Sequence, residues 1–209
     1  MPHKRRIGMT YSDMTWAQLN KKILACRKCG LSVHNPTPAY GDHKAAIMIL
    51  GQSLHKEPNS VPFACASGRP ISTTLAELGL GVIPWPPMGD EEPPKVLLTN
   101  VVHCFPADHK VTDSIIETCR PFLKRELALL KPHVVIALGT IARRTMEEIY
   151  GAYPRNNEVV EVLRPHLFIM GCMHPAAALR SEDVEDWKAM FTTHVKKAVS
   201  LSERSKRCV

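Results

Sequence analysis

The sequence predicts an α/β fold, a three-layer α/β/α sandwich around a central, mainly parallel sheet of four or five strands. Two observations support this prediction. Short β-branched and aliphatic runs alternate with longer segments of helical periodicity, which is the order of parallel strands joined by crossover helices. In addition, 209 residues suffice for one domain with a substantial core and no disulfide staples. We expect a single domain over residues 15–201, between a flexible basic N-terminus at 1–14 and a basic tail at 202–209.

Five apolar runs are the expected strands of this sheet. They span residues 45–50, 96–104, 132–139, 159–163 and 167–173. The second run is bounded by prolines and has the composition of a strand buried on both faces. Its second half carries an amide, Asn100, and a thiol, Cys104. Because ligands of open α/β sheets gather at the carboxyl ends of the strands, we expect this strand to serve two sites, one that reads a ligand and one that holds a metal.

Helical periodicity predicts five helices along the chain. They span residues 15–25, 72–80, 113–130, 140–150 and 182–201. Thr15 is the expected N-cap of the first helix, and Pro121 is expected to kink or restart the third. We expect residues 36–43 to form a turn-rich link and the proline-rich, acidic residues 83–94 to form a surface excursion.

Charge and composition narrow the class of protein. The net charge of +7 favours a polyanionic partner, nucleic acid above all. No apolar run approaches the length of about 18 residues that a membrane span requires, and no apolar segment of a secretory signal follows the basic start of the chain. We therefore expect a cytoplasmic protein with no membrane partner. In a reducing compartment, seven cysteines point to metal ligands or free thiols before disulfides.

Four cysteines form a widely spaced pattern. Cys26 and Cys29 make a CxxC pair, Cys104 follows after 74 residues, and Cys119 after 14 more. Taken alone, the CxxC pair fits half of a zinc site, half of an iron–sulfur site, a redox pair or chance, and the redox pair is least supported because no βαβ pattern precedes it. The distant second pair is unusual for a zinc ribbon and suits a cluster held by four thiolates, with zinc as the alternative metal. The remaining cysteines, expected to be free thiols, are Cys65, Cys172 and Cys208.

Six short motifs stand in a characteristic order between Cys26 and the C-terminal helix. They are CxxCxL at residues 26–31, Pro62-Phe63 with Gly68, TNVVHC at 99–104 with Pro106, CxPxL at 119–123, Leu138-Gly139, and HPAAALR at 174–180. Together they resemble the iron–sulfur uracil-DNA glycosylases, family 4 of the uracil-DNA glycosylase superfamily. Six matches in the family's order are far more specific than any one of them.

The resemblance implies a role for each matching position. It implies that Phe63 stacks on a base flipped out of DNA and that Asn100 reads the Watson–Crick edge of that base. His174 would donate a hydrogen bond to a base carbonyl and stabilise the anionic leaving group. Phe63 as a core residue, Asn100 as a structural amide and His174 as part of a turn are the plainer interpretations. The resemblance further implies a structural [4Fe–4S] cluster on four ligands, Cys26, Cys29, Cys104 and Cys119.

Further positions follow from the same resemblance. The base pocket would also include Gly51, Gln52 and Ser53. Leu179 and Arg180 stand where the family inserts a wedge into the duplex and contacts flanking phosphates. The full set of expected DNA-binding residues is Gly68, Arg69, Pro175, Ala176, Leu179 and Arg180.

The first active-site loop departs from the family pattern. The family has GEAPG, whereas this chain has GQSLH at residues 51–55. Gln52 can hold a water molecule but cannot accept its proton, which leaves His55 as a surrogate base. Three outcomes follow: base departure is dissociative enough for Gln52 or His55 to suffice, the substrate is another deaminated base, or catalysis is lost and a DNA-binding module remains.

We therefore predict a monomeric, monofunctional DNA glycosylase that releases uracil or another deaminated base from DNA and leaves an abasic site. A catalytically weak or inactive DNA-binding protein of the same fold is the alternative. No lysine is clearly placed for a lyase step. The run between Cys104 and Cys119 is too short for the basic, histidine-bearing insertion through which another branch of the superfamily crosslinks to DNA.

Overall fold

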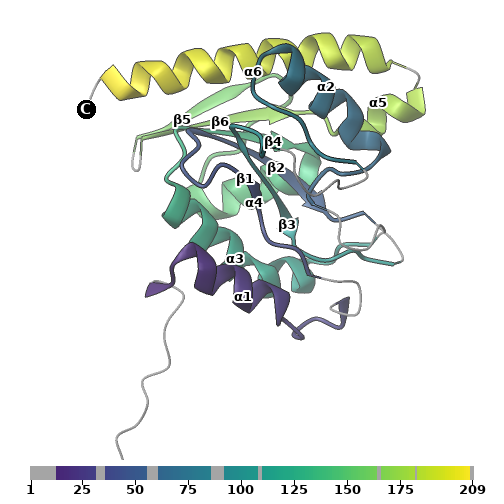
Figure 1. The fold of residues 1–209 in the computed structure, drawn as a ribbon, viewed down its shortest axis with the longest axis vertical. Coiled ribbons are helices and arrows are strands. Elements are labelled where there is room, and N and C mark those ends of the chain that lie inside the picture. Colours follow the sequence, from purple (N-terminus) through teal and green to yellow (C-terminus); the bar gives the residue numbers. More distant parts are fainter. Residues whose placement is uncertain are drawn as a thin grey trace, which may run out of the picture.

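The structure, a computed structural model, describes residues 13–31, 36–55, 61–85, 92–107, 110–163, 166–181 and 183–207. A six-stranded sheet lies between two layers of helices (Figure 1). The helices are α1 (Trp16–Leu24), α2 (Arg69–Glu77), α3 (Asp113–Leu130), α4 (Gly139–Tyr150), α5 (Pro175–Ser181) and α6 (Val184–Arg207), and a 3₁₀ turn, η3 (Ala66–Gly68), precedes α2. One face of the sheet is covered by α2, α5 and α6, and the other by α3 and α4, with α1 packed against α3.

The sheet is mainly parallel, as the sequence predicts. Its strands are β1 (Tyr40–Gly41), β2 (Ile47–Ser53), β3 (Leu97–Val102), β4 (Val134–Leu138), β5 (Val159–Val162) and β6 (Leu167–Cys172), in the order β1-β3-β2-β4-β6-β5. The four central strands are parallel, and β1 and β5 pair antiparallel at the two edges. The sheet has six strands instead of four or five because Tyr40 and Gly41 pair with β3 inside the expected link. A two-residue edge strand leaves no periodicity in the sequence.

The two cores follow from the alternation of side chains along the strands. In β2, Ile49 packs toward α2 and α6, whereas Met48 and Leu50 pack toward α3 and α4. Because every central strand is buried on both faces, the sheet cannot hold polar side chains except where they find partners or line a cavity. Polar groups on β2 and β3 therefore mark the site.

Three helices differ from expectation. α3 is one continuous helix through Pro121 and does not restart there, since burial of its apolar face outweighs the hydrogen bond that proline removes. α2 begins at Arg69, three residues early, because Pro70 fits the first turn of a helix. The expected helix at 182–201 is α6, which continues to Arg207, six residues beyond the expected end, whereas the short helix α5 before it was not expected. The capping box of Thr15 and Gln18 agrees with the expected N-cap of α1.

Some expectations fall on residues outside the described part of the chain: most of the basic N-terminus, residues 86–91 of the excursion, and Cys208. Within the described part, the six cysteines form no disulfide. No described helix has both the length and the apolar character needed to cross a bilayer.

Candidate active site and metal centre

A cavity of about 340 Å³ opens at the carboxyl ends of β2 and β6. Three segments far apart in the sequence meet in it: the end of β2, the turn before α2, and the start of α5. Its lining is Gln52, Ser53, Leu54, His55, Phe63, Cys65, Ser67, His174, Ala176, Ala177 and Arg180. A larger cavity of about 530 Å³ lies at the other end of the strands, around Lys131 and His133 just before β4. None of the expected site residues lines it.

His174 lies at the pocket as a neutral imidazole. The backbone N–H of Ala176 donates to Nδ1 of His174 at 3.2 Å, so the ring proton is on Nε2. Burial, helped by the charge of Arg180, lowers the pKa of His174 to about 4. Trp187 of α6 donates from Nε1 to the Met173 carbonyl at 2.8 Å and holds the chain just before the histidine. His174 therefore presents one fixed N–H donor without a net charge.

Gly139, at the start of α4, makes room for this histidine. A Cβ at Gly139 would lie 3.0 Å from Cβ of His174, and Gly139 has a φ of +83°. Any side chain there would be strained and would crowd the imidazole. The Leu138-Gly139 motif is thus explained by the position of His174.

Phe63 is held in the pocket wall by a strained turn. Its φ is +66°, which is rare for a bulky residue and marks a position that the surrounding structure enforces. The Cys65 N–H donates to the Phe63 carbonyl at 2.8 Å. A Cβ on Gly68 would lie 1.7 Å from that same carbonyl oxygen, so only glycine fits at this position. The motif of Pro62-Phe63 with Gly68 therefore fixes the aromatic ring.

Asn100 lies beside Phe63 and Gly51 and is buried, with 2% of its surface exposed. Gly51 pairs with Asn100 across β2 and β3, and a Cβ on Gly51 would lie 2.4 Å from Oδ1 of Asn100 and 2.8 Å from Cζ of Phe63. Among the described residues, Nδ2 of Asn100 has no hydrogen-bond partner. A buried amide N–H without a partner costs free energy, so this group is suited to a ligand. Asn100 and Gly51 adjoin Phe63 instead of forming the pocket wall directly.

Gln52 and His55 flank the pocket mouth. Gln52 is half-buried at the end of β2, and His55 is exposed, with its ring centroid 6.4 Å from that of Phe105. The Leu54 N–H donates to the Cys104 carbonyl at 3.3 Å and joins this loop to the end of β3. The described lining of the pocket contains no aspartate or glutamate. The usual acidic water-activating group of the family loop is therefore not replaced from elsewhere in that lining.

The expected DNA-binding residues lie in different places around the pocket. Ala176 and Arg180 line it, and Leu179 is 40% exposed beside them on α5. Arg69 lines an adjoining cavity of about 260 Å³ instead. The other two, Pro175 and Gly68, are buried. Pro175 directly follows His174 at the start of α5, and Gly68 packs against the carbonyl of Phe63.

The structure also brings together the four cysteines of the widely spaced pattern. Cys26 and Cys29 follow α1, Cys104 follows β3, and Cys119 is on α3. Burial raises the pKa of the Cys104 thiol to about 12, and the neighbouring charges of Cys119, Cys29 and Cys26 raise it further in that order. The four sulfurs therefore lie within electrostatic reach of one another.

The chemistry of the four ligands is the observation that bears on the metal. In the described part of the chain, no three His, Cys, Asp or Glu side chains form a site for a single metal ion. A four-iron cluster takes four thiolates, each on a different iron. The donor set, four thiols with two of them buried, fits such a cluster.

A buried polar network of Thr99, His103 and Glu126 lies next to Cys119. The sequence indicates no special role for His103. Oγ1 of Thr99 donates to Oε2 of Glu126 at 2.7 Å, and Nε2 of His103 donates to Oε1 of Glu126 at 2.9 Å. Burial acts to lower the pKa of His103, but the charge of Glu126 and hydrogen bonds to Cys119 and Glu126 raise it to about 10. Burial also acts on Cys119, yet the hydrogen bond and charge of His103 lower the pKa of that thiol. No sequence signal links Glu126 to His103, because they are 23 residues apart on different elements.

Four residues of the pocket lining are not among the expected site residues: Leu54, Cys65, Ser67 and Ala177. Sγ of Cys65 lies 3.2 Å from Oγ of Ser67. The sequence indicates Cys65 only as a free thiol. Its position two residues after Phe63, in the same turn, was the available signal.

Comparison with known proteins agrees with this architecture. Residues 38–198 match the model of the uracil DNA glycosylase superfamily. The chain belongs to that superfamily. It is 31% identical over 143 residues to a type-4 uracil-DNA glycosylase of Pyrobaculum aerophilum, covering 66% of this chain and 67% of that protein. It is 27% identical over 184 residues to the type-4 enzyme of Archaeoglobus fulgidus, covering 82% and 87%. It is 30% identical over 123 residues to a type-5 uracil-DNA glycosylase of P. aerophilum, covering 56% and 54%.

The matched region includes all three segments of the pocket, together with Cys104 and Cys119. It begins after Cys26 and Cys29, so the match to the superfamily does not depend on the CxxC pair. The match therefore covers the whole described pocket lining and two of the four cysteines of the widely spaced pattern.

Proposed function

We propose that this superfamily member is a monofunctional DNA glycosylase that hydrolyses the N-glycosidic bond of uracil, or of another deaminated base, flipped out of DNA. Superfamily membership and the names of its type-4 relatives support the reaction class. The observation that carries the proposal is the neutral His174, which presents its single N–H donor in a pocket at the carboxyl edge of the sheet.

His174 stabilises the leaving group. As the bond between the sugar C1′ and the base nitrogen breaks, the electron pair goes to the base and negative charge develops on its carbonyl oxygen. The Nε2–H of His174 donates to that oxygen, and its orientation is set in advance by the Ala176 N–H on Nδ1. Because the donor is already in place, no rearrangement is needed when the charge appears.

Asn100 and Phe63 recognise the extruded base. Chemistry at C1′ requires the nucleotide to leave the stack and enter a pocket. The unpartnered Nδ2 of Asn100 donates to an acceptor on the Watson–Crick edge, and the Phe63 ring stacks on the face of the base. The base thereby satisfies a buried donor that has no partner within the described protein.

Water adds to C1′ and loses a proton. Gln52 holds this water with its amide, and His55 or solvent takes the proton, since no carboxylate is present in the described pocket lining. Arg180 at the pocket and Leu179 beside it contact the DNA around the gap that the flipped nucleotide leaves.

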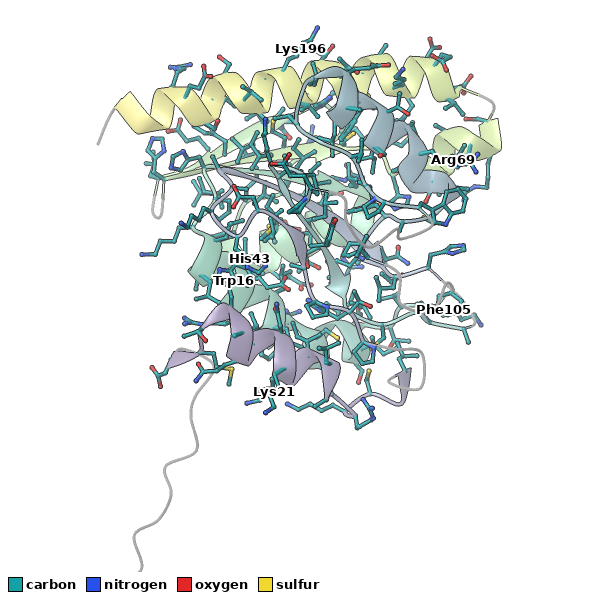
Figure 2. All side chains as sticks on the ribbon, in the orientation of Figure 1. Trp16, Lys21, His43, Arg69, Phe105 and Lys196 are labelled. Atoms are coloured by element: carbon teal, nitrogen blue, oxygen red, sulfur yellow. The ribbon has the colours of Figure 1, made fainter. Side chains whose placement is uncertain are left out.

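Cys26, Cys29, Cys104 and Cys119 would hold a [4Fe–4S] cluster. When bound, the group supplies a structural crosslink and no reaction step. It joins the end of α1 to β3 and α3, and the hydrogen bond from Leu54 to the Cys104 carbonyl links this corner to the pocket loop. A second contact holds α1 in place, since Trp16 stacks on His43 with ring centroids 4.3 Å apart (Figure 2).

A DNA-binding protein without catalysis is the second candidate, and the carboxylate-free pocket is the observation that favours it. Uracil-, hypoxanthine- and xanthine-containing oligonucleotides separate the two candidates. We expect single-turnover release of at least one base, slowed about a hundredfold to a thousandfold in His174→Ala. His166→Ala is the matched control, because His166 is an exposed histidine at the other end of the strands. Binding to all three substrates with no base release would establish the second candidate instead.

The metal is tested on the purified protein. We expect iron and acid-labile sulfide in a four-to-four ratio, in keeping with a four-iron cluster. Cys104→Ser should lose the iron, whereas Cys172→Ser should keep it, because Cys172 is an equally buried thiol at the end of β6. Stoichiometric zinc in a colourless protein would refute the cluster.

A further inference from the structure

Beside the base pocket lies a second cavity that the proposed reaction does not use. It measures about 260 Å³ and is lined by Phe63, Cys65, Gly68, Arg69, Ser72, Thr73, Ile83 and Trp85. Phe63 and Cys65 also line the base pocket, so the two cavities share one wall. A DNA strand whose nucleotide enters the base pocket therefore lies close to the second cavity.

Trp85 is the notable side chain of this cavity. It is 37% exposed and is the one aromatic among the exposed large hydrophobic residues that the structure describes. The other two tryptophans have partners of their own: Trp187 is buried and stacks on Phe191, and Trp16 stacks on His43. An indole that is partly exposed beside a candidate active-site pocket offers an aromatic face on which a base can stack.

The position of Trp85 is fixed by α2. The Ile83 N–H donates to Oγ of Ser72 at 2.9 Å, and Ile83 is buried against the core. The Arg69 guanidinium lies over the indole, with Cζ 4.4 Å from the ring centroid. Figure 2 shows Arg69 on the same side of the molecule as Phe105, at the edge where α5 also lies in Figure 1. The indole is thus held beside the cavity by its contact with Arg69 and by the hydrogen bond that ties Ile83 to α2.

The charge around the two cavities favours an anion. Arg69 forms no hydrogen bond or ion pair with any other described residue, and its guanidinium keeps its N–H donors for a ligand. Arg180 lines the base pocket itself. No carboxylate is present in the described lining of either cavity. One arginine in each of two adjoining cavities, together with an aromatic side chain, matches a chain of phosphates and bases.

We propose that Trp85 and Arg69 form a stacking platform for an unpaired base that neighbours the flipped nucleotide on the same strand, with Arg69 on the adjoining phosphate. The proposal rests on the proposed function for the position of the flipped nucleotide. A neighbouring base can reach the indole only when it is not paired in a duplex. The platform therefore makes single-stranded DNA the preferred substrate class.

Binding to uracil-free oligothymidine tests the platform without requiring catalysis. We expect Trp85→Ala to weaken binding of a labelled single-stranded oligonucleotide about fivefold to a hundredfold, the usual range for loss of one stacked base. Trp85→Phe should keep most of the affinity, because phenylalanine also stacks. Leu163→Ala is the matched control, since Leu163 is 78% exposed near the opposite edge of the sheet and should bind as the unchanged protein does.

Comparison of strands and variants decides the outcome. Trp85→Ala should weaken single-stranded binding by a larger factor than duplex binding, and Arg69→Ala should also reduce the salt dependence of binding. Equal losses on both DNA forms, or no loss with Trp85→Ala, would overturn the platform. The probe contains no uracil, so its binding does not depend on base release. If the protein releases no base from the uracil-, hypoxanthine- and xanthine-containing oligonucleotides but needs Trp85 to bind the single-stranded probe, the proposed function is refuted and the platform stands.

Discussion

Strand β3 and the turn after it contribute buried polar side chains to two regions, and these side chains differ in whether they have hydrogen-bond partners. At Asn100 the strand lies beside Phe63, next to the base pocket, and the amide Nδ2 has no partner among the described residues. Three residues later His103 enters a network with Glu126 and Thr99 in which both carboxylate oxygens are bonded. A buried polar group costs free energy unless it is paired, so the free donor of Asn100 suits a ligand. The difference teaches that burial alone does not mark a functional residue. A missing partner alone does not mark one either, since Asn20, His103 and Arg120 also carry a buried atom without a described partner; what marks Asn100 is its place beside the pocket.

Removal of Glu126 should have the largest effect on stability. In Glu126→Ala, the imidazolium of His103 and the hydroxyl of Thr99 lose their partner in a site with no access to water. We expect the free energy of unfolding to fall by about 3–5 kcal/mol, as when one member of a buried pair is removed. Chemical denaturation measures this value, and Glu126→Gln should lose less because it keeps the shape and one acceptor. A loss below about 1 kcal/mol would mean that the network is not the stabilising half of the comparison.

Acid should reveal the pocket half of the comparison. Because burial lowers the pKa of His174 from 6.5 to about 4, the folded protein binds fewer protons than the unfolded chain between these values. Stability contributed by this group therefore falls as the pH drops from about 6.5 toward 4. Between pH 7 and 4.5 we expect the unfolding free energy to fall by roughly 2–3 kcal/mol more in the unchanged protein than in His174→Asn. Identical pH dependence in the two proteins would contradict the neutral, buried imidazole.

Asn100→Ala should separate function from stability most directly. Hydrogen bonds to a charged partner contribute about 1.5–3 kcal/mol, so we expect base release to slow by roughly tenfold to a hundredfold. The unfolding free energy should change by no more than about 1 kcal/mol, since the substitution removes a donor that has no described partner. Single-turnover rates and denaturation of the same preparation give both numbers. A large stability loss with an unchanged rate would show that Asn100 is structural.

The sequence predicted the parts of the molecule that depend on local patterns. Local strand patterns located β2, β3, β4, β5 and β6. The four central strands carry runs of buried apolar residues, and β5 is a short β-branched strand that is only half-buried. The resemblance named Phe63, His174 and Arg180, and the structure places all three in the lining of one cavity, while their roles stay predictions. These successes share a cause, namely that the signal lies within a few consecutive residues.

The missed features depend on contacts between distant segments. β1 exists only because Tyr40 finds the edge of β3, and α3 passes through Pro121 because tertiary packing holds it. The pairing of His103 with Glu126 and the stacking of Arg69 on Trp85 likewise join different elements. None of these leaves a pattern within one window of the sequence.

The smallest expected effect is on the rate of uracil release when a carboxylate is introduced into the pocket. Glu126 is the one buried carboxylate in the described chain, and it belongs to the network, while the described pocket lining has none. Gln52→Glu would move a carboxylate into the pocket, near the sugar carbon that becomes electron-deficient and near Arg180. General-base help is often worth more, but desolvation of the new charge opposes it, so we expect uracil release at pH 7.5 to rise about tenfold. Gln52→Ala is the control and should slow release, because it removes the amide that holds the water. A slower reaction in Gln52→Glu would show that the base departs without a proton acceptor in a neutral pocket. The absence of a carboxylate from the described pocket lining would then serve catalysis, just as the carboxylate of Glu126 serves stability in its network.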